Sequence, residues 1–275
     1  MNATPELMRT VTAHKDATDS GNPMHDDAAA RALNFKGGLV PGINVAGYMT
    51  HPLVSHFGAQ WLSSGTMQVR LRRPVYAGEV VNVSAELRSG DGGQDVLEVH
   101  VSNPAGEVCA VGLGAMHSVG VVDNVPATPI AEFRALPAAR WPAERADFER
   151  EVTLGSIDAC FEPGEANAYL NAMQDDHQDY KDGVTHPAWL LRQANIIVDR
   201  NFDVGPWIHV SSEVRNFAPA RIDERVEIRA QVVDLFEKKG HQYADLDVAL
   251  LAEGDPERPL MRVLHRAIYK MGGPV

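Results

Sequence analysis

An internal repeat at a long period constrains this chain more than any other feature of its sequence. The stretch GLVPGINVAGYMT, which begins at Gly38, resembles GVTHPAWLLRQAN, which begins at Gly183, an offset of 145 residues. Carried downstream without a gap, the offset pairs identical residue types: Val69 with Val214, Arg70 with Arg215, Pro74 with Pro219, Glu79 with Glu224, Val81 with Val226 and Ala85 with Ala230. Self-similarity at a fixed period is typical of a duplicated structural unit. We therefore expect two copies of one fold.

Each copy shows the same order of secondary-structure patterns. Apolar residues recur with helical spacing over 43–57 and over 188–202. Strict apolar alternation follows and predicts strands at 65–73, 80–88, 95–102 and 107–119, and again at 208–217, 225–235, 242–251 and 260–270. One long helix followed by antiparallel strands predicts an α+β layer in which the helix lies on the sheet.

The segment between the copies has the composition of a linker. It contains four prolines from Pro126 to Pro142 and no sustained hydrophobic period. We therefore divide the chain into an N-terminal domain over 1–122, a Pro- and Ala-rich linker over 123–146 and a C-terminal domain over 147–275.

Charge and cysteine content exclude several classes of protein. Asp and Glu number 37 against 25 Lys and Arg, a net charge of −12, which argues against a nucleic-acid groove because phosphates require clustered cations. No apolar run reaches the roughly 18 residues of a membrane span, and the first residues include no apolar signal region. We expect a cytoplasmic protein that binds neither nucleic acid nor a membrane. Cys109 and Cys160 lack the spacing of a disulfide framework or a zinc site.

A duplicated unit with one long helix wrapped by an antiparallel sheet resembles the double hotdog fold. The segment SGNPMHDDAAARALNFKGGLVPG, from Ser20 to Gly42, is similar to the motif of the MaoC-like, or hydratase 2, family. In that motif, Gly-Asp-x-Asn-Pro-x-His leads through an acidic, Ala-rich segment to an aliphatic-Ala-His-Gly turn that opens the central helix. Asn22, Pro23, His25 and Gly42 match the motif.

The resemblance implies an enzyme that adds or removes water across the double bond of an acyl thioester on coenzyme A or acyl carrier protein. The family's Asp and His hold the water, and N–H groups at the helix N-terminus donate to the thioester oxygen. The resemblance implies no metal or redox cofactor. Coenzyme A or the carrier protein enters only as part of the substrate.

The two copies depart from the motif in complementary ways. Ser20 occupies the Asp position of the first copy, and Asp19 lies one residue too early. The second copy has Asp175 at the Asp position and Tyr180 at the His position. Each copy thus keeps one partner of the Asp/His pair.

The helix openings differ as well. Pro41 replaces the motif His in the first copy and is followed by Gly42, whereas the second copy keeps His186 but follows it with Pro187. Proline has no N–H to donate. We therefore place the thioester oxygen at the Gly42 N–H, near His25.

His25 is the candidate general base or water ligand, and Asp19, Asp26 or Asp175 could orient it. Other roles stay open for these carboxylates. Asp19 suits a turn before Gly21, and Asp26 or Asp27 suits the N-cap of a helix through AAARAL.

Further candidate substrate-binding residues are Asn22, Tyr180 and His186. His186 could instead cap the second central helix, and Tyr180 could fill a half-buried gap.

Three arginines form the sharpest basic cluster of this acidic chain: Arg70, Arg72 and Arg73. They are candidates to bind the phosphates of coenzyme A or an acidic carrier protein. A solvated strand face is the alternative.

Three functions therefore compete. The first is an enoyl-thioester hydratase or 3-hydroxyacyl-thioester dehydratase, in which His25 activates water and the Gly42 N–H stabilises the thioester oxygen. The second is a hotdog thioesterase, in which a carboxylate activates water to attack the thioester carbonyl. The third is a non-catalytic acyl-CoA or lipid-binding protein or partner subunit, which the split Asp/His pair favours. A duplicated chain is compatible with a monomer or a homodimer.

Overall fold

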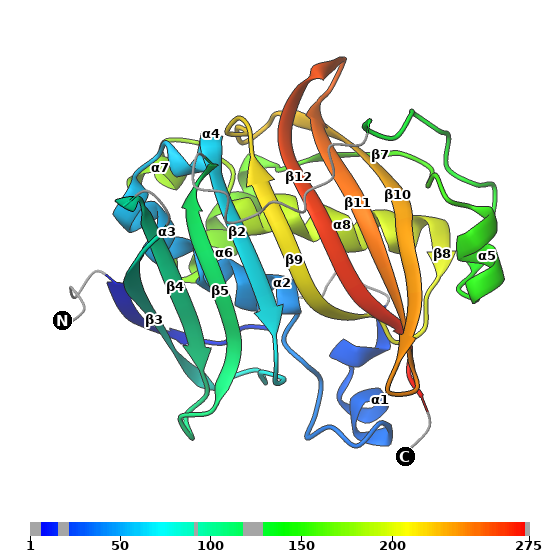
Figure 1. Cartoon of the computed structure of the whole chain (residues 1–275), viewed down its shortest axis with the longest axis horizontal. Coiled ribbons are helices and arrows are strands. Elements are labelled where there is room, and N and C mark those ends of the chain that lie inside the picture. The colour runs from blue at the N-terminus through cyan, green and yellow to red at the C-terminus, as the bar shows by residue number, and fades with distance from the viewer. Residues whose placement is uncertain (1–6, 16–21, 91–92, 118–128, 273–275) are drawn as a thin grey trace.

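A computed structural model describes residues 7–15, 22–90, 93–117 and 129–272 of the chain. Over these residues it contains a ten-stranded antiparallel sheet in the order β1-β3-β4-β5-β2-β9-β12-β11-β10-β7. The central helices lie against one face of this sheet, and the other face carries no described helix (Figure 1). The α+β class predicted from the sequence is confirmed.

The eight strands predicted from alternation are all present, and each half adds an edge strand. The first half contains β1 (Met8–Thr12), β2 (Gly65–Leu71), β3 (Val80–Ser89), β4 (Asp95–Ser102) and β5 (Val108–Met116). The second half contains β7 (Ile157–Cys160), β9 (Ile208–Asn216), β10 (Arg225–Lys238), β11 (His241–Ala252) and β12 (Asp255–Lys270). A separate short parallel pair consists of β6 (Trp141–Pro142) and β8 (Phe202–Asp203).

The helical elements of the first half are η2 (Pro23–His25), α1 (Asp27–Ala32), α2 (Gly42–Tyr48), α3 (Thr50–Phe57) and α4 (Trp61–Ser64). Those that follow are α5 (Arg145–Arg150), α6 (Pro163–Met173), α7 (Gln178–Lys181) and α8 (Pro187–Asn201). None of the helices in the described ranges has the length and apolarity needed to span a bilayer.

The two halves join at the β2–β9 pair in the middle of the sheet. Strands β5, β4, β3 and β1 follow β2 on one side, and β12, β11, β10 and β7 follow β9 on the other. Gln68 lies opposite Glu213 in this pair, and Gln68 Nε2 donates to Glu213 Oε1 at 3.2 Å. The same two residues are equivalent under the 145-residue offset, so an approximate twofold axis passes between them. The sequence repeat is therefore a structural repeat.

The central helix differs between the copies. The sequence predicts one helix over 43–57, but the structure interrupts it at Met49, between α2 and α3. Pro52 explains the interruption, because it has no N–H for the Tyr48 carbonyl and its ring crowds that carbonyl. The second copy has Ile197 at the equivalent position, and α8 is continuous.

The predicted linker has little regular structure where it is described. Residues 129–140 form no helix or strand, and β6 then pairs with β8 at the end of α8. Residues 123–128 lie outside the described part of the chain.

Helices α2 and α8 cross where their side chains are smallest. A Cβ added to Gly47 would lie 2.6 Å from the Ala188 Cβ and 2.3 Å from Met173 Cε. These distances are below any normal van der Waals contact, so glycine allows the close approach. One cluster of buried apolar residues runs through both halves.

We expect Gly47→Ala to lower the free energy of unfolding by about 1–3 kcal/mol, because the added methyl overpacks the helix crossing. This cost exceeds the helix-propensity gain of about 1 kcal/mol. Gly164→Ala in α6 is the matched control, since no heavy atom lies within 4 Å of its Cβ position and the substitution should stabilise. Urea denaturation measures both. A more stable Gly47→Ala protein would contradict the tight crossing.

Candidate active site

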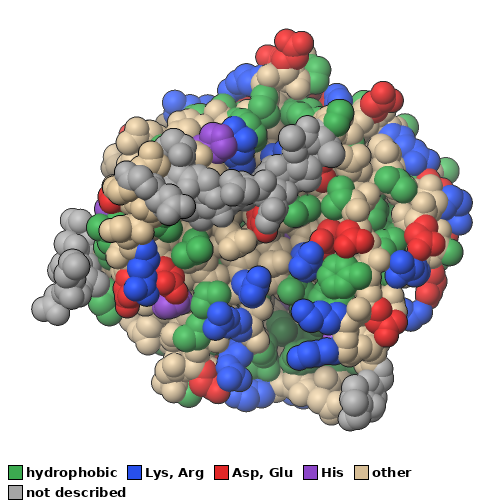
Figure 2. All heavy atoms as spheres, viewed as in Figure 1, with side chains coloured by type: hydrophobic (Ala, Val, Ile, Leu, Met, Phe, Trp, Pro, Cys, Tyr) green, Lys and Arg blue, Asp and Glu red, His purple; other side chains and the backbone are tan. Residues whose placement is uncertain are grey.

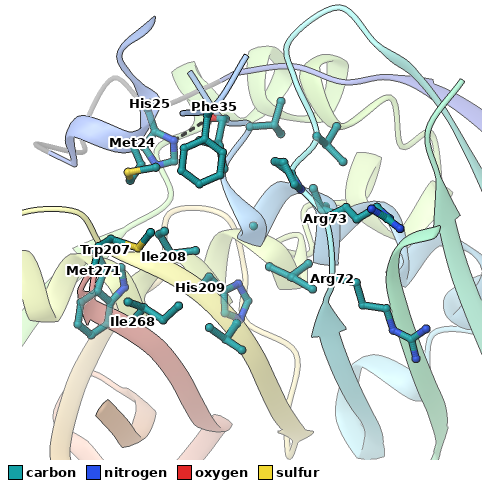
Figure 3. A pocket seen from close by; sticks show the side chains of 18 of the residues that line it. Met24, His25, Phe35, Arg72, Arg73, Trp207, Ile208, His209, Ile268 and Met271 are labelled. Carbon is teal, nitrogen blue, oxygen red and sulfur yellow. Dashed lines mark hydrogen bonds between the residues drawn. The ribbon is translucent and has the colours of Figure 1, made fainter. Parts of the chain in front are cut away.

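A cavity of about 350 Å³ lies at the start of α2, between the first half and strand β9 of the second (Figure 3). Its walls are mainly apolar and include Val40, Val45, Leu71, Trp207, Ile208 and Ile268. Its polar groups come from His25, Gly42, His209, Tyr243, Arg72 and Arg73. A concave, mostly apolar space with a few polar groups is typical of a small-molecule site.

His25 ends the η2 turn and faces this cavity. Its Nδ1 lies 2.8 Å from the Leu39 carbonyl oxygen, the contact dashed in Figure 3. A carbonyl only accepts, so Nδ1 carries the proton and Nε2 keeps a lone pair, with the Asn22 amide nitrogen 3.5 Å away. Burial lowers the pKa of His25 below 6.5, against a smaller opposite effect of the Leu39 carbonyl. The ring is therefore a neutral base at pH 7.

Asn22 positions the loop that carries His25. Its Oδ1 accepts the Met24 N–H at 3.1 Å and the Trp207 N–H at 3.2 Å, and its Nδ2 donates to the Trp207 carbonyl. Asn22 thereby attaches the motif to the second half of the chain. It is not among the residues that line the cavity.

The candidate carboxylates do not contact His25 within the described ranges. Asp26 is the N-cap of α1, where its Oδ1 accepts the Ala29 N–H at 2.8 Å. Asp175 bonds to other histidines. Asp19 lies outside the described residues. The lining side chains of the cavity, over the part of the chain that is described, include no Asp or Glu.

Gly42 leaves the start of α2 open to the cavity. As the first residue of the helix, it has an N–H without an intrahelical acceptor. A Cβ there would lie 2.3 Å from Leu71 Cδ1 and 3.0 Å from His209 Nδ1. Leu71 and His209 thus pack directly against the start of α2, and only glycine fits there without displacing them.

His209 is a cavity residue that the sequence analysis did not single out. Its Nε2 lies 2.8 Å from Ser212 Oγ, which lies 3.0 Å from His265 Nδ1. Strict strand alternation would place His209 and Ser212 on opposite faces. Val210 is an extra residue opposite the Arg266–Ala267 step of β12, and this bulge turns both side chains inward.

The arginine cluster divides between two places. Arg72 and Arg73 line the cavity, and Figure 3 places them across it from His25. Arg70 and Arg72 border a separate hollow on the sheet face opposite the central helices. Figure 2 shows basic side chains gathered around a recess in the lower middle of this face. Arg73 also lies 3.6 Å from the Glu107 carboxylate.

Among the described residues, only a small hollow lies beside the start of α8, the position equivalent to the start of α2. The hollow beside Pro187 and Ala188 is about 10 Å³, less than one water molecule requires. His186 is 0% exposed, and its Nδ1 accepts the Ala188 N–H at 3.1 Å, which caps α8. Tyr180 is 1% exposed. Neither Tyr180 nor His186 lines the cavity beside His25.

Asp175 connects the two halves. Its Oδ1 lies 3.0 Å from His51 Nδ1, and its Oδ2 lies 3.3 Å from His186 Nε2 and 4.0 Å from the Arg9 guanidinium. Burial acts to raise the pKa of the Asp175 carboxyl, but hydrogen bonds from His186 and His51 hold it well below its usual range. The carboxylate is therefore a buried anion shared by both halves.

The same cluster contains residue types that bind metal ions in other proteins. Asp175, His51 and His177 each place one ligand atom within 4.8 Å of the other two. Two His and one carboxylate can bind a divalent transition metal. Here the carboxylate already bonds to two histidines, and the positive charge of Arg9 beside it opposes a further cation. We therefore interpret the cluster as a hydrogen-bonded junction between the halves.

Comparisons with known proteins support the fold. No protein-family model matches the sequence, and no curated protein sequence matches it either. A protein described as a MaoC domain dehydratase, from Chloroflexus aurantiacus J-10-fl, is 11% identical with a TM-score of 0.63, over 97% of this chain and 96% of that one. A Mycobacterium tuberculosis protein described as having a double hotdog fold is 15% identical with a TM-score of 0.59, over 94% and 93%.

A thioesterase-type structure is similar as well. A protein described as a thioesterase II, from Thermobifida fusca YX, is 12% identical with a TM-score of 0.52, over 98% of this chain and 94% of that one. Together these likenesses show that the chain has a double hotdog fold.

We expect Asp175→Asn to lower the free energy of unfolding by about 3 kcal/mol, because removing one partner leaves the buried groups around it without their counter-charge. Asp176→Asn is the matched control, since Asp176 is exposed and should change stability by less than about 0.5 kcal/mol. Urea denaturation at pH 7 compares the two. Equal effects would contradict the role of Asp175 as a junction.

Proposed function

We propose that the chain binds an acyl thioester in the cavity beside α2 and adds or removes water at the double bond next to the thioester carbonyl. The observation that carries this proposal is that one apolar cavity is lined by a neutral His25 and by Gly42, whose N–H has no intrahelical acceptor. A base and an N–H donor are the two groups that this chemistry needs. The motif around Asn22 and His25 and the double hotdog fold support the same reaction.

In the hydration direction, His25 Nε2 accepts a proton from water while the water oxygen bonds to the β carbon. The electrons of the double bond move toward the carbonyl, and negative charge develops on the thioester oxygen, where the Gly42 N–H stabilises it. The protonated His25 then returns its proton to the α carbon. In this proposal one histidine performs both transfers, and the described residues that line the cavity include no carboxylate.

The Leu39 carbonyl prepares His25 for this role. It accepts the Nδ1 proton, which fixes the ring orientation and leaves Nε2 as the basic nitrogen. Burial keeps the pKa of His25 below 6.5, so the basic form predominates at pH 7.

We also propose that Arg72 and Arg73 bind the phosphates of a coenzyme A thioester. Both are exposed at the cavity, in a chain whose net charge is −12. An acidic protein must concentrate cations locally to bind phosphate, and guanidinium groups suit that ligand.

Binding without turnover is a second candidate function. It is favoured by the absence of a carboxylate beside His25 in the described part of the chain. The same observation counts against a thioesterase that relies on a carboxylate to activate water. Release of free thiol from acyl-CoA would reveal a thioesterase, and a thermal shift without turnover would reveal a binding protein.

We expect His25→Asn to reduce hydration of crotonyl-CoA by about 100-fold or more, the usual contribution of a general base. The Asn amide can still donate to the Leu39 carbonyl, but nothing replaces Nε2, so the loop should stay folded. Loss of the enoyl absorbance measures the rate. The wild-type rate should decrease as the pH is lowered through the pKa of His25, which lies below 6.5, because the protonated ring has no lone pair.

His14→Asn is the control for this substitution, because His14 is exposed and lies outside the cavity. An undiminished rate in the His25→Asn protein would refute His25 as the base.

We expect the double substitution Arg72→Ala and Arg73→Ala to raise the KM for crotonyl-CoA about tenfold, the equivalent of 1.4 kcal/mol. The KM for crotonyl-pantetheine, which lacks the phosphates, should not change. Arg70→Ala is the matched control, since Arg70 is exposed on β2, just before Arg72 and Arg73, but does not line the cavity. Equal increases for both substrates would contradict a phosphate site.

A further inference from the structure

His209 is a buried polar residue at the cavity whose second ring nitrogen is free. The residue is 6% exposed, and its Nδ1 makes no hydrogen bond in the described part of the chain. Figure 3 shows the ring on β9, beside the start of α2. The position of a Gly42 Cβ lies 3.0 Å from Nδ1, so this nitrogen and the Gly42 backbone border the same space. A buried polar atom without a partner usually costs stability, and at a cavity it indicates a ligand.

The hydrogen bonds behind the ring determine which nitrogen carries the proton. If His265 Nδ1–H donates to Ser212 Oγ, the Ser212 hydroxyl donates to His209 Nε2, and Nδ1 of His209 bears the hydrogen. The reverse arrangement would leave a lone pair at Nδ1. Burial lowers the pKa of His209 to about 4, against smaller opposite effects of the Ser211 and Gly42 backbones, so the ring is neutral at pH 7. In a neutral ring whose Nε2 accepts from Ser212, the hydrogen is on Nδ1.

The rings of His209 and His265 stack with centroids 4.4 Å apart, so neither can rotate freely. His265 is 0% exposed, and Ser212 is 1% exposed. The donor at Nδ1 is therefore held in place among buried side chains. A fixed donor of this kind stabilises developing charge without reorganisation, and a neutral imidazole can act in this way.

We propose that His209 is a second donor to the thioester carbonyl, so that its Nδ1–H and the Gly42 N–H bind the oxygen together. This inference rests on the proposed binding of an acyl thioester in the cavity. His209 does not transfer a proton; it stabilises the charge that His25 creates at the other end of the conjugated system. Ser212 and His265 are positioning residues that keep the hydrogen on Nδ1.

A matched pair of substitutions tests the donor. The amide nitrogen of Asn lies about where His Nδ1 lies, and that of Gln about where Nε2 lies. We expect His209→Gln to lower kcat for crotonyl-CoA about 100-fold, the usual effect of losing one such donor. We expect His209→Asn to stay within about tenfold of the wild type, with KM little changed in both. Equal losses in the two variants would overturn the proposal.

A carbonyl stretching frequency gives a readout that does not require turnover. Butyryl-CoA labelled with ¹³C at the carbonyl should show a lower frequency when bound to the wild-type protein than in water. His209→Gln should reduce this shift, and His209→Asn should retain most of it. A wild-type frequency equal to that of the free thioester would overturn the proposal.

The Ser212→Ala variant tests the relay while keeping His209 in place. It should lower kcat in the wild-type background but not in the His209→Asn background, because an amide N–H needs no fixed tautomer. Equal effects in both backgrounds would overturn the assignment of Ser212 as a positioning residue. Thermal unfolding checks that each variant is folded, and if His209→Gln does not fold, Ser212→Ala and the carbonyl frequency decide.

The two proposals fail in different ways. A lowered carbonyl frequency that depends on His209, without hydration of crotonyl-CoA, would refute the proposed reaction and support the second donor. Hydration with an unaltered carbonyl frequency would support the reaction and overturn the second donor. No binding of butyryl-CoA at all would overturn both.

Discussion

The pairing of β2 with β9 is the interaction on which the rest of the structure depends. It joins two hotdog units into one sheet, with Gln68 and its repeat equivalent Glu213 facing each other across the approximate twofold axis. This pairing brings the start of β9 beside the start of α2, so that the second half supplies Trp207 and His209 to a cavity of the first half. Asn22 strengthens the arrangement, because it bonds to both backbone groups of Trp207.

The duplicated units have diverged at the positions where the twofold relation would create two sites. In the first half, Gly42 leaves a helix N–H open to an apolar cavity. In the second, Pro187 offers no N–H, His186 is buried as the cap of α8, and the corresponding hollow is too small for a ligand. Asp175 occupies the position equivalent to the Asp of the MaoC-like motif, but its carboxylate bonds to His51 of the first half and to His186 of the second. One unit thus retains the features of a site, and the other stabilises it.

The electrostatics of the cavity follow from its burial. The described residues place no carboxylate on its walls, and burial lowers the pKa of both His25 and His209, so the two rings are neutral at pH 7. Neutral rings in an apolar space act as a base or as a hydrogen-bond donor, according to which nitrogen the protein protonates. The Leu39 carbonyl makes that choice for His25, and the Ser212–His265 pair makes it for His209. The proposed roles of His25 and His209 differ because different hydrogen-bond partners hold the two rings: the Leu39 carbonyl for His25 and the Ser212 hydroxyl for His209.

Much of this architecture could be predicted from the sequence, because hydrophobic periodicity is a local pattern and the repeat compares two such patterns 145 residues apart. They predicted the eight main strands and the two central helices, whereas the motif around His25 was identified by its resemblance to the MaoC-like motif. The break at Pro52 follows from the missing N–H of proline, although periodicity alone gave a single helix.

Two features depended on contacts between distant segments. The Val210 bulge arises from pairing with β12. Without it, strict alternation would place His209 on the sheet face opposite to that of Ser212, away from the cavity. The partners of Asp175 include His51 and Arg9, which are distant along the chain. The sequence by itself determined the duplicated units, their strands and the histidine of the motif. The tertiary structure decided which unit has a cavity and which side chains meet there, because strand register, bulges and cross-half packing are set by segments that local patterns do not connect.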